Sequence, residues 1–232
     1  MRNKTLLSLV AGVVILYVLA RVFNIVQFYT NDTPAMEPTL KVGTLIFATN
    51  LISPKRNSIV AFKINPYLEG NPYKIPSEES IYLSRIIGLE NEIIQIKDGK
   101  VFINDKELEH PFGVKFLYKL YSTDYYNYAK ELNLELVSDQ TLVGDMAYVY
   151  LTKDLYRELS KKIEIETFDY PLKRDDLYRN NEFSGTNWSS NNFGPIEIPK
   201  DNYFMISDNR DNAMDSRIYG FIHKDEIVGV KI

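Results

Sequence analysis

An uncharged apolar run near the N-terminus constrains this chain more than any other feature of its sequence. Arg2 and Lys4 precede residues 5–20, TLLSLVAGVVILYVLA, and after Arg21 the apolar character resumes over residues 22–29, VFNIVQFY. A helix that crosses a bilayer needs about 20 residues, so we expect the span to continue a turn or more past Arg21. Positive charge before the span predicts a cytoplasmic N-terminus and an extracytoplasmic main domain.

The same run has a second interpretation, as a signal peptide that is removed. Residues 18–20, VLA, place a small residue where such a peptide could be cut. The apolar stretch after Arg21 favours a retained anchor instead. The sequence therefore predicts that residues 1–29 form a cytoplasmic N-terminus and one transmembrane helix, with the membrane lipid bilayer as a partner.

The composition of the chain excludes several classes of function. With 232 residues, 45% hydrophobic content and a net charge of -4, it is typical of a folded globular protein. The sequence has no dense stripe of Lys and Arg, so no nucleic acid is expected as a partner. The lack of cysteine excludes a disulfide framework and thiolate chemistry.

Beyond residue 30, short apolar runs alternate with turn residues, a pattern that predicts β-strands. The pair Asp98-Gly99 between two such runs predicts a β-hairpin. The fold class is therefore expected to be mainly β, a β-rich α+β domain. The expected strands are residues 44–49, 59–64, 81–87, 92–96, 101–103, 203–206 and 226–230.

The middle of the chain differs in character, because it is rich in Tyr and in charge. Helices are expected over residues 124–132 and 153–162, and Thr152 stands where the second helix would have its N-cap. Residues 184–194, SGTNWSSNNFG, predict a polar loop that returns to the core. The domains that follow the anchor are a β core, residues 30–104 plus 198–232, and an inserted Tyr-rich α/β module, residues 105–197.

Three short segments, in this order, resemble the signatures of the signal peptidase I family. Residues 33–40, TPAMEPTL, are similar to the Ser-Met-x-Pro-Thr-Leu segment that carries the nucleophile. Residues 81–89, IYLSRIIGL, are similar to Tyr-x-Lys-Arg-x-x-Gly-Leu, in which Lys is the general base. Residues 208–220, DNRDNAMDSRIYG, resemble the Gly-Asp-Asn-Arg-Asp-Asn-Ser-x-Asp-Ser-Arg box. Each match alone is weak, whereas three in order are a specific signal.

The resemblance implies a signal peptidase I-like antiparallel β core with an inserted second module, and a peptide-cleaving site that uses no metal or cofactor. In this family a Ser hydroxyl attacks the peptide bond and a neutral, desolvated Lys takes its proton. Carried over residue by residue, the nucleophile falls on Ala35, the base on Ser84 and the Ser that orients the lysine on Ala213. None of these side chains can take over the step assigned to its position. Thr33 matches the hydroxyl that assists the oxyanion hole.

The resemblance also assigns residues outside the bond-breaking step. Four residues are expected to line a groove for small side chains: Met36, Leu40, Tyr82 and Leu83. For Leu40 and Leu83, ordinary core packing is an equally good interpretation. Asp215 and Arg217 resemble the structural ion pair of the box. A calcium loop in this acidic stretch is disfavoured, because Arg210 lies among the would-be ligands.

We therefore expect a membrane-anchored, signal peptidase-like protein of a bacterial-type inner membrane that has lost catalysis. It would bind an exported preprotein, its signal peptide or an extracytoplasmic assembly partner. The alternative is an active serine endopeptidase with an unconventional nucleophile or base. The two histidines, His110 and His223, offer no such base, since neither stands in the signature segments. A third interpretation gives residues 105–197 a purely structural role.

Overall fold

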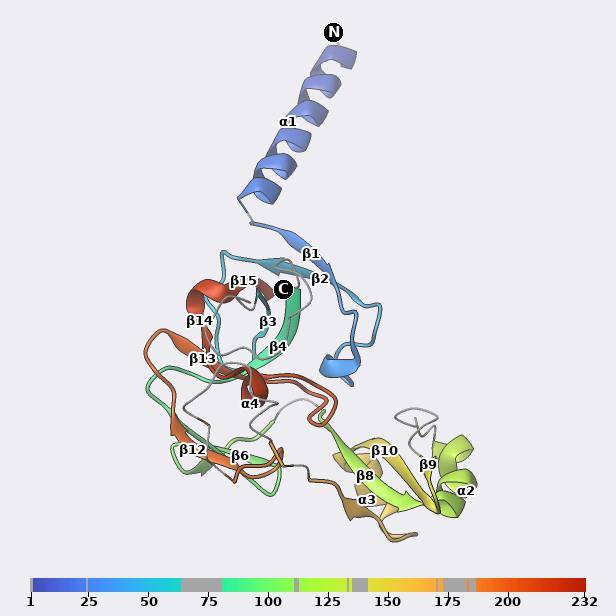
Figure 1. Cartoon of the computed structure of the whole chain (residues 1–232). Helices are drawn as coiled ribbons and strands as arrows, with labels where there is room; N and C mark the ends of the chain where they lie inside the picture. Colours follow the sequence, from blue (N-terminus) through green and yellow to red (C-terminus); the bar gives the residue numbers. More distant parts are fainter. Residues whose placement is uncertain are drawn as a thin grey trace.

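In the computed structural model, a long helix projects from a β-rich body (Figure 1). Residue 64 of one expected strand and residues 184–186 of the expected loop lie outside the described part of the chain. The structure describes residues 2–23, 25–63, 81–110, 113–132, 134, 142–169, 171–172, 183 and 187–232.

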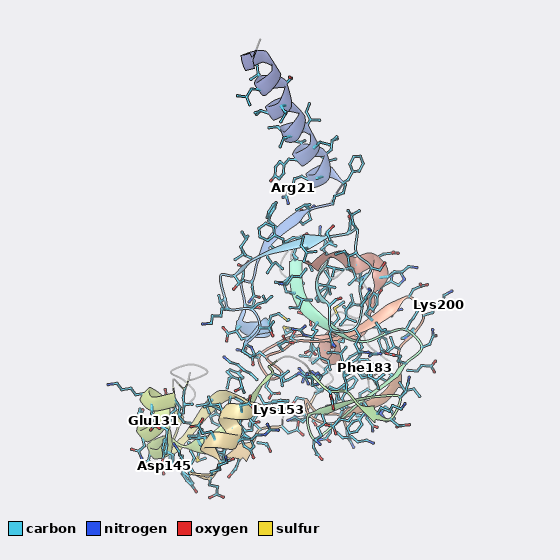
Figure 2. The ribbon with its side chains drawn as sticks, turned by 180° about the vertical axis from the view of Figure 1, so that it is seen from behind. Arg21, Glu131, Asp145, Lys153, Phe183 and Lys200 are labelled. Atoms are coloured by element: carbon cyan, nitrogen blue, oxygen red, sulfur yellow. The ribbon has the colours of Figure 1, made fainter. Side chains whose placement is uncertain are left out.

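The projecting helix is α1, Arg2–Val22, and it ends earlier than the sequence predicted. Instead of continuing a turn or more past Arg21, the chain turns and forms strand β1, Gln27–Thr30, because pairing with β2 satisfies its backbone groups. At the base of the helix (Figure 2), Arg21 donates to Gln27 Oε1 at 3.0 Å and lies over the ring of Phe28. No helix within the described residues combines the length and apolar character needed to cross a membrane.

The largest sheet has seven strands and joins both ends of the β-rich chain. Its neighbouring strands are antiparallel, and the C-terminal strand β15 is inserted between β2 and β3. All five strands expected from the sequence in this sheet are confirmed within a residue or two. In spatial order the strands are β1, β2 (Leu45–Thr49), β15 (Ile227–Lys231), β3 (Ile59–Lys63), β4 (Ile81–Gly88), β13 (Asn202–Ile206) and β14 (Ile222–His223).

A second sheet packs its apolar side chains into an aromatic-rich core. Its strands are β12 (Phe193–Glu197), β5 (Ile93–Lys97), β6 (Lys100–Ile103) and β7 (Lys106–Glu107). The expected hairpin is confirmed, since Asp98 and Gly99 between β5 and β6 have φ values of 49° and 72°. The predicted polar loop ends too late, because Phe193 is buried and already belongs to β12.

The third sheet and two helices lie at the end of the molecule away from α1 (Figure 1). Their apolar faces enclose a separate core, and both expected helices are present. Thr152 caps α3 as expected, its side chain accepting a hydrogen bond from Leu155 N at 3.3 Å. The elements are β11 (Glu166–Thr167), β8 (Lys115–Tyr121), β10 (Met146–Thr152), β9 (Leu142–Val143), α2 (Ser122–Leu132) and α3 (Lys153–Leu159).

Candidate functional site

A pocket of about 430 Å³ brings the three signature segments together. One wall follows β1 into the 3-10 helix η1, Pro34–Met36; another is the start of β4; the third is the loop before helix α4, Ser216–Tyr219. These segments lie more than forty residues apart in the chain, so the pocket exists only because the seven-stranded sheet folds. The lining residues are Thr30, Asn31, Asp32, Thr33, Pro34, Ala35, Ile81, Tyr82, Leu83, Asp211, Asn212, Ala213, Met214 and Tyr219.

The position of the family nucleophile faces this pocket but carries no reactive group. Ala35 lies in η1, and its carbonyl accepts a hydrogen bond from Asn209 N at 2.9 Å. The Asn209 side chain also donates to the carbonyl of Pro34 at 3.2 Å, so the loop holds η1 in place from two directions. Thr33 lines the pocket at the N-cap of η1, and its side chain makes no capping bond, which leaves the hydroxyl available to a ligand.

The position of the family base is closed off from the pocket. Ser84 is buried in β4, and its Oγ lies 3.0 Å from Oγ of Ser207. Ser207 stands immediately before Asp208, at the position where the signal peptidase I box begins with Gly. The hydroxyl pair therefore occupies buried space next to the Cβ atom of residue 84, through which a lysine side chain at this position would have to extend. Neither hydroxyl can act as a base near neutral pH.

The remaining predicted site residues divide into pocket wall and core. Ala213 lines the pocket with a methyl group, and Tyr82 and Leu83 line it from β4. Met36 and Leu40 lie beneath the pocket instead, in a core cluster of buried residues. Both side chains therefore pack in the core, and neither lines the pocket wall.

Asp215 and Arg217 form a buried ion pair below the pocket. The guanidinium donates to both carboxylate oxygens, at 2.9 Å and 2.8 Å, and also to the carbonyl of Ser190. The Asp215 carboxylate accepts from the backbone N–H of Arg217 at 3.1 Å, which caps the start of α4, and from that of Ser207 at 3.1 Å. Through Ser207, which also contacts Ser84, the ion pair connects the third signature segment to the position of the family base.

A second buried network, which the sequence analysis did not identify, connects all three segments. Asp208 accepts hydrogen bonds from Thr39 Oγ1 at 2.5 Å and from Arg85 Nε at 2.7 Å. Arg85 also donates to the carbonyl of Asn57 at 2.7 Å. The signal was present in the sequence, since each of the three segments contributes one of these polar residues, but the pairing depends on the fold.

Neither histidine supplies a base to the pocket. His223 belongs to β14, where it caps the 3-10 helix η4, Lys224–Glu226. His110 lies 3.1 Å from Nη2 of Arg210, and burial together with that guanidinium lowers the pKa of the imidazole to about 3. Within the described residues no three His, Asp or Glu side chains form a metal-binding group.

The charged residues of the pocket wall are acidic, a feature that the sequence analysis did not anticipate. Asp32 reaches it from the segment before η1, and Asp211 from the box. Burial raises the pKa of Asp211, although nearby Arg217 and Arg210 and a hydrogen bond from Leu117 N oppose that shift. The pocket can thus offer hydrogen bonds and negative charge to a ligand, but no strong base.

Comparison with known proteins gives a consistent result along almost the whole chain. A model of the family described as "Signal peptidase, peptidase S26" matches residues 3–232. Signal peptidase I of Buchnera aphidicola subsp. Baizongia pistaciae is 27% identical over 208 residues, which cover 84% of this chain and 64% of that protein. Signal peptidase I T of Bacillus subtilis (strain 168) is 26% identical over 235 residues, covering 98% and 84%.

A solved structure also matches. The crystal structure of a signal peptidase I from Enterococcus faecalis V583 aligns with a TM-score of 0.35 and 20% identity, over 77% of this chain and 97% of that one. The chain spans less than two thirds of the length of the Buchnera relatives.

Proposed function

This chain belongs to the signal peptidase I family, and from that membership and the geometry of the site we propose that it binds an extended segment of an exported polypeptide without cleaving it. The observation that carries the proposal is the state of the two reaction positions. Ala35 has a methyl group in the pocket, and Ser84 is buried against Ser207. Loss of a nucleophile or its base costs about a millionfold in turnover in a well-studied serine peptidase.

The surviving polar groups do not replace what was lost. Thr33 has a hydroxyl at the pocket, but an alcohol is a weak nucleophile unless a base takes its proton. Among the described residues that line the pocket, the candidates for that base are the carboxylates of Asp32 and Asp211. A carboxylate is a poor match for an alcohol proton near neutral pH, which favours binding over catalysis.

The first residues of β4 form a free strand edge to which a polypeptide could bind. Residues 81–83 pair with β3 on one side, while β13 pairs with β4 only from Arg85 onwards. No described strand occupies the other edge of residues 81–83, and Tyr82 and Leu83 line the pocket there. An extended peptide can add to such an edge through main-chain hydrogen bonds and place alternate side chains in the pocket.

We propose further that α1 attaches the protein to a membrane, with the β-rich body on the extracytoplasmic side. The apolar side chains of α1 support this, since Leu7 is 72% and Leu16 is 68% exposed. Their partner would be lipid, and the bound chain would be an exported preprotein, its signal peptide or an assembly partner. The full chain should stay with membranes in alkaline carbonate; release into the supernatant would count against attachment by α1.

A paired binding and cleavage experiment tests the proposed function. The full chain in detergent should bind a preprotein with an Ala-x-Ala site and leave it uncut. The variant Ala35→Ser/Ser84→Lys/Ser207→Gly restores nucleophile and base and removes the hydroxymethyl group that faces the base; it should cut the same site. The matched control Ala35→Ser/Ser84→Met/Ser207→Gly has a side chain of similar length without an amine and should remain silent.

Two results would overturn this proposal. Cleavage by the unmodified chain would show that another residue carries the reaction. Absence of binding by the unmodified chain would remove the proposed role altogether. Two substitutions test whether the peptide binds in the pocket. Ala213→Tyr should fill part of the pocket and weaken binding, whereas Val42→Tyr, at an exposed position outside the pocket, should leave binding unchanged.

A further inference from the structure

We infer that the pocket selects polypeptides that place a small hydroxyl-bearing side chain, Ser or Thr, against the amide oxygen of Asn31. This inference rests on the proposed function, since it names a side chain that the same pocket prefers. The observation that carries it is a buried amide in the pocket wall whose oxygen accepts no hydrogen bond from any described residue. A bound polypeptide can supply the missing donor.

The hydrogen bonds of Asn31 fix the orientation of its amide group. Nδ2 donates to the carbonyl of Leu40 at 2.9 Å and to the carbonyl of Lys41 at 3.2 Å. Carbonyl oxygens are acceptors only, so they can bind the nitrogen end of an amide but not its oxygen end. The oxygen, Oδ1, therefore lies on the side of the amide that faces away from these two carbonyls.

The Oδ1 atom is open toward the pocket. No described residue donates to it, and it is not one of the unpartnered polar atoms that the fold seals from solvent. Asn31 as a whole is only 2% exposed, and it lines the pocket between the three signature segments. The little surface that this acceptor retains is therefore presented to a ligand in the pocket.

The backbone of Asn31 holds the acceptor in one position. Its N–H donates to the carbonyl of Thr44 at 2.9 Å, and its carbonyl accepts from Gly43 N at 2.8 Å. Together with the two bonds of Nδ2, these contacts close the base of the loop that carries Ala35. A ligand donor that meets Oδ1 does not have to order a mobile side chain first, which favours binding.

The surroundings of Asn31 favour a small neutral donor. Ala35, Leu83 and Ala213 line the same pocket with apolar groups, so a peptide that binds there displaces water from Oδ1. An Ala side chain would leave the oxygen without a partner, whereas a Ser hydroxyl would replace the lost hydrogen bond. Ser adds a single oxygen to the Ala of the proposed Ala-x-Ala segment and so keeps the side chain small.

Matched peptides test this inference with the full chain in detergent. A fluorescent peptide with an Ala-x-Ala core is compared with versions in which each Ala in turn is replaced by Ser or by α-aminobutyrate, which has a methyl group in place of the Ser hydroxyl. At one of the two positions, Ser should bind about fivefold more tightly than α-aminobutyrate, as expected for one neutral hydrogen bond. Because the Asn31 amide is uncharged, raising the salt concentration from about 50 to about 500 mM should leave this ratio unchanged.

A substitution assigns the preference to Asn31. Asn31→Leu keeps the shape of the side chain and removes the amide, so the ratio of Ser to α-aminobutyrate affinity should fall to one or below, while binding of the α-aminobutyrate peptide persists as a check on folding. Asn50→Leu is the matched control. Asn50 also donates its amide to a carbonyl, that of Phe23 at 3.0 Å, but it is exposed and lies outside the pocket, so the ratio should not change.

Three results would contradict this inference. Equal binding of the Ser and α-aminobutyrate peptides to the original chain would refute the preference but keep the proposed function, and this comparison remains decisive even if Asn31→Leu does not fold. A preference for Ser that survives Asn31→Leu would assign it to another group of the wall, such as the Thr33 hydroxyl, and would also refute the role of Asn31. Failure of every peptide to bind the original chain would overturn both this inference and the proposed function.

Discussion

Removal of the Ser84 hydroxyl is expected to destabilise the protein more than removal of both hydroxyls of the Ser84–Ser207 pair. The two Oγ atoms are 3.0 Å apart, and the residues are 1% and 0% exposed. In Ser84→Ala, the Ser207 hydroxyl is left without its partner in a place that water does not reach. In Ser84→Ala/Ser207→Ala no hydroxyl is left behind, so the penalty for a buried unpaired group disappears.

The size of the effect follows from this burial. A buried polar group without a partner costs about 1–3 kcal/mol, so each single variant should lose that much free energy of unfolding. The double variant should lie within about 1 kcal/mol of the original protein, because replacing both partners by apolar groups is nearly neutral. With about 2 kcal/mol for each single variant and about 1 kcal/mol for the double variant, the coupling energy between the two positions is about 3 kcal/mol, at the upper end of the values for side chains in direct contact.

The single tryptophan of the chain provides the assay. Trp188 packs on Phe193, with ring centroids 4.4 Å apart, and against the core of the second sheet. Its fluorescence during urea unfolding of the full chain in detergent reports the loss of that core. Ser160→Ala removes an exposed hydroxyl from the end of α3 and is the matched control, with an expected change below about 0.5 kcal/mol. Losses in the double variant that equal the sum of the single losses would refute the reasoning.

Two further predictions concern charged groups. Asp215→Asn leaves the buried Arg217 guanidinium without its carboxylate and should cost about 3–5 kcal/mol in urea unfolding, whereas the exposed Asp225→Asn should cost less than about 0.5 kcal/mol. Because the pKa of His110 is lowered from 6.5 to about 3, the folded state binds fewer protons than the unfolded state between these values. Stability should therefore fall as the pH drops below about 6.5, and His110→Gln should flatten this part of the curve; an unchanged slope would contradict this account.

Most of the β framework could be predicted from the sequence, because local signals and tertiary structure agree there. Asp98-Gly99 requires a tight hairpin, and Thr152 offers a hydroxyl at the start of a helix; both act over four residues or fewer. The prediction for residues 22–29 was wrong, because an apolar run of that length fits a helical span as well as a strand, and residues 27–30 pair with β2 instead. The strands of the third sheet were missed, although buried residues alternate along both β8 and β10.

The sequence assigns residues to the site, but it does not contain the contacts that connect them. Ala35, Ser84 and Ala213 could be named because the signature segments fix their positions, and the structure brings two of them to the pocket. The bond from Ser84 to Ser207 spans 123 residues and depends on how β4 pairs with β13, so no local pattern contains it. The same holds for Asp211, whose acidic contribution depends on which side of the box faces the pocket.

The short connection between α1 and the pocket sets a tether length. Only 13 residues, 23–35, lead from the end of the helix to the wall at Ala35, a fully extended reach of at most about 45 Å. If a bilayer holds α1, as proposed, every bound polypeptide has to come within that distance of the lipid surface. A chain that emerges from the same membrane would then meet the pocket at a high effective concentration, so even weak contacts along residues 81–83 would be occupied.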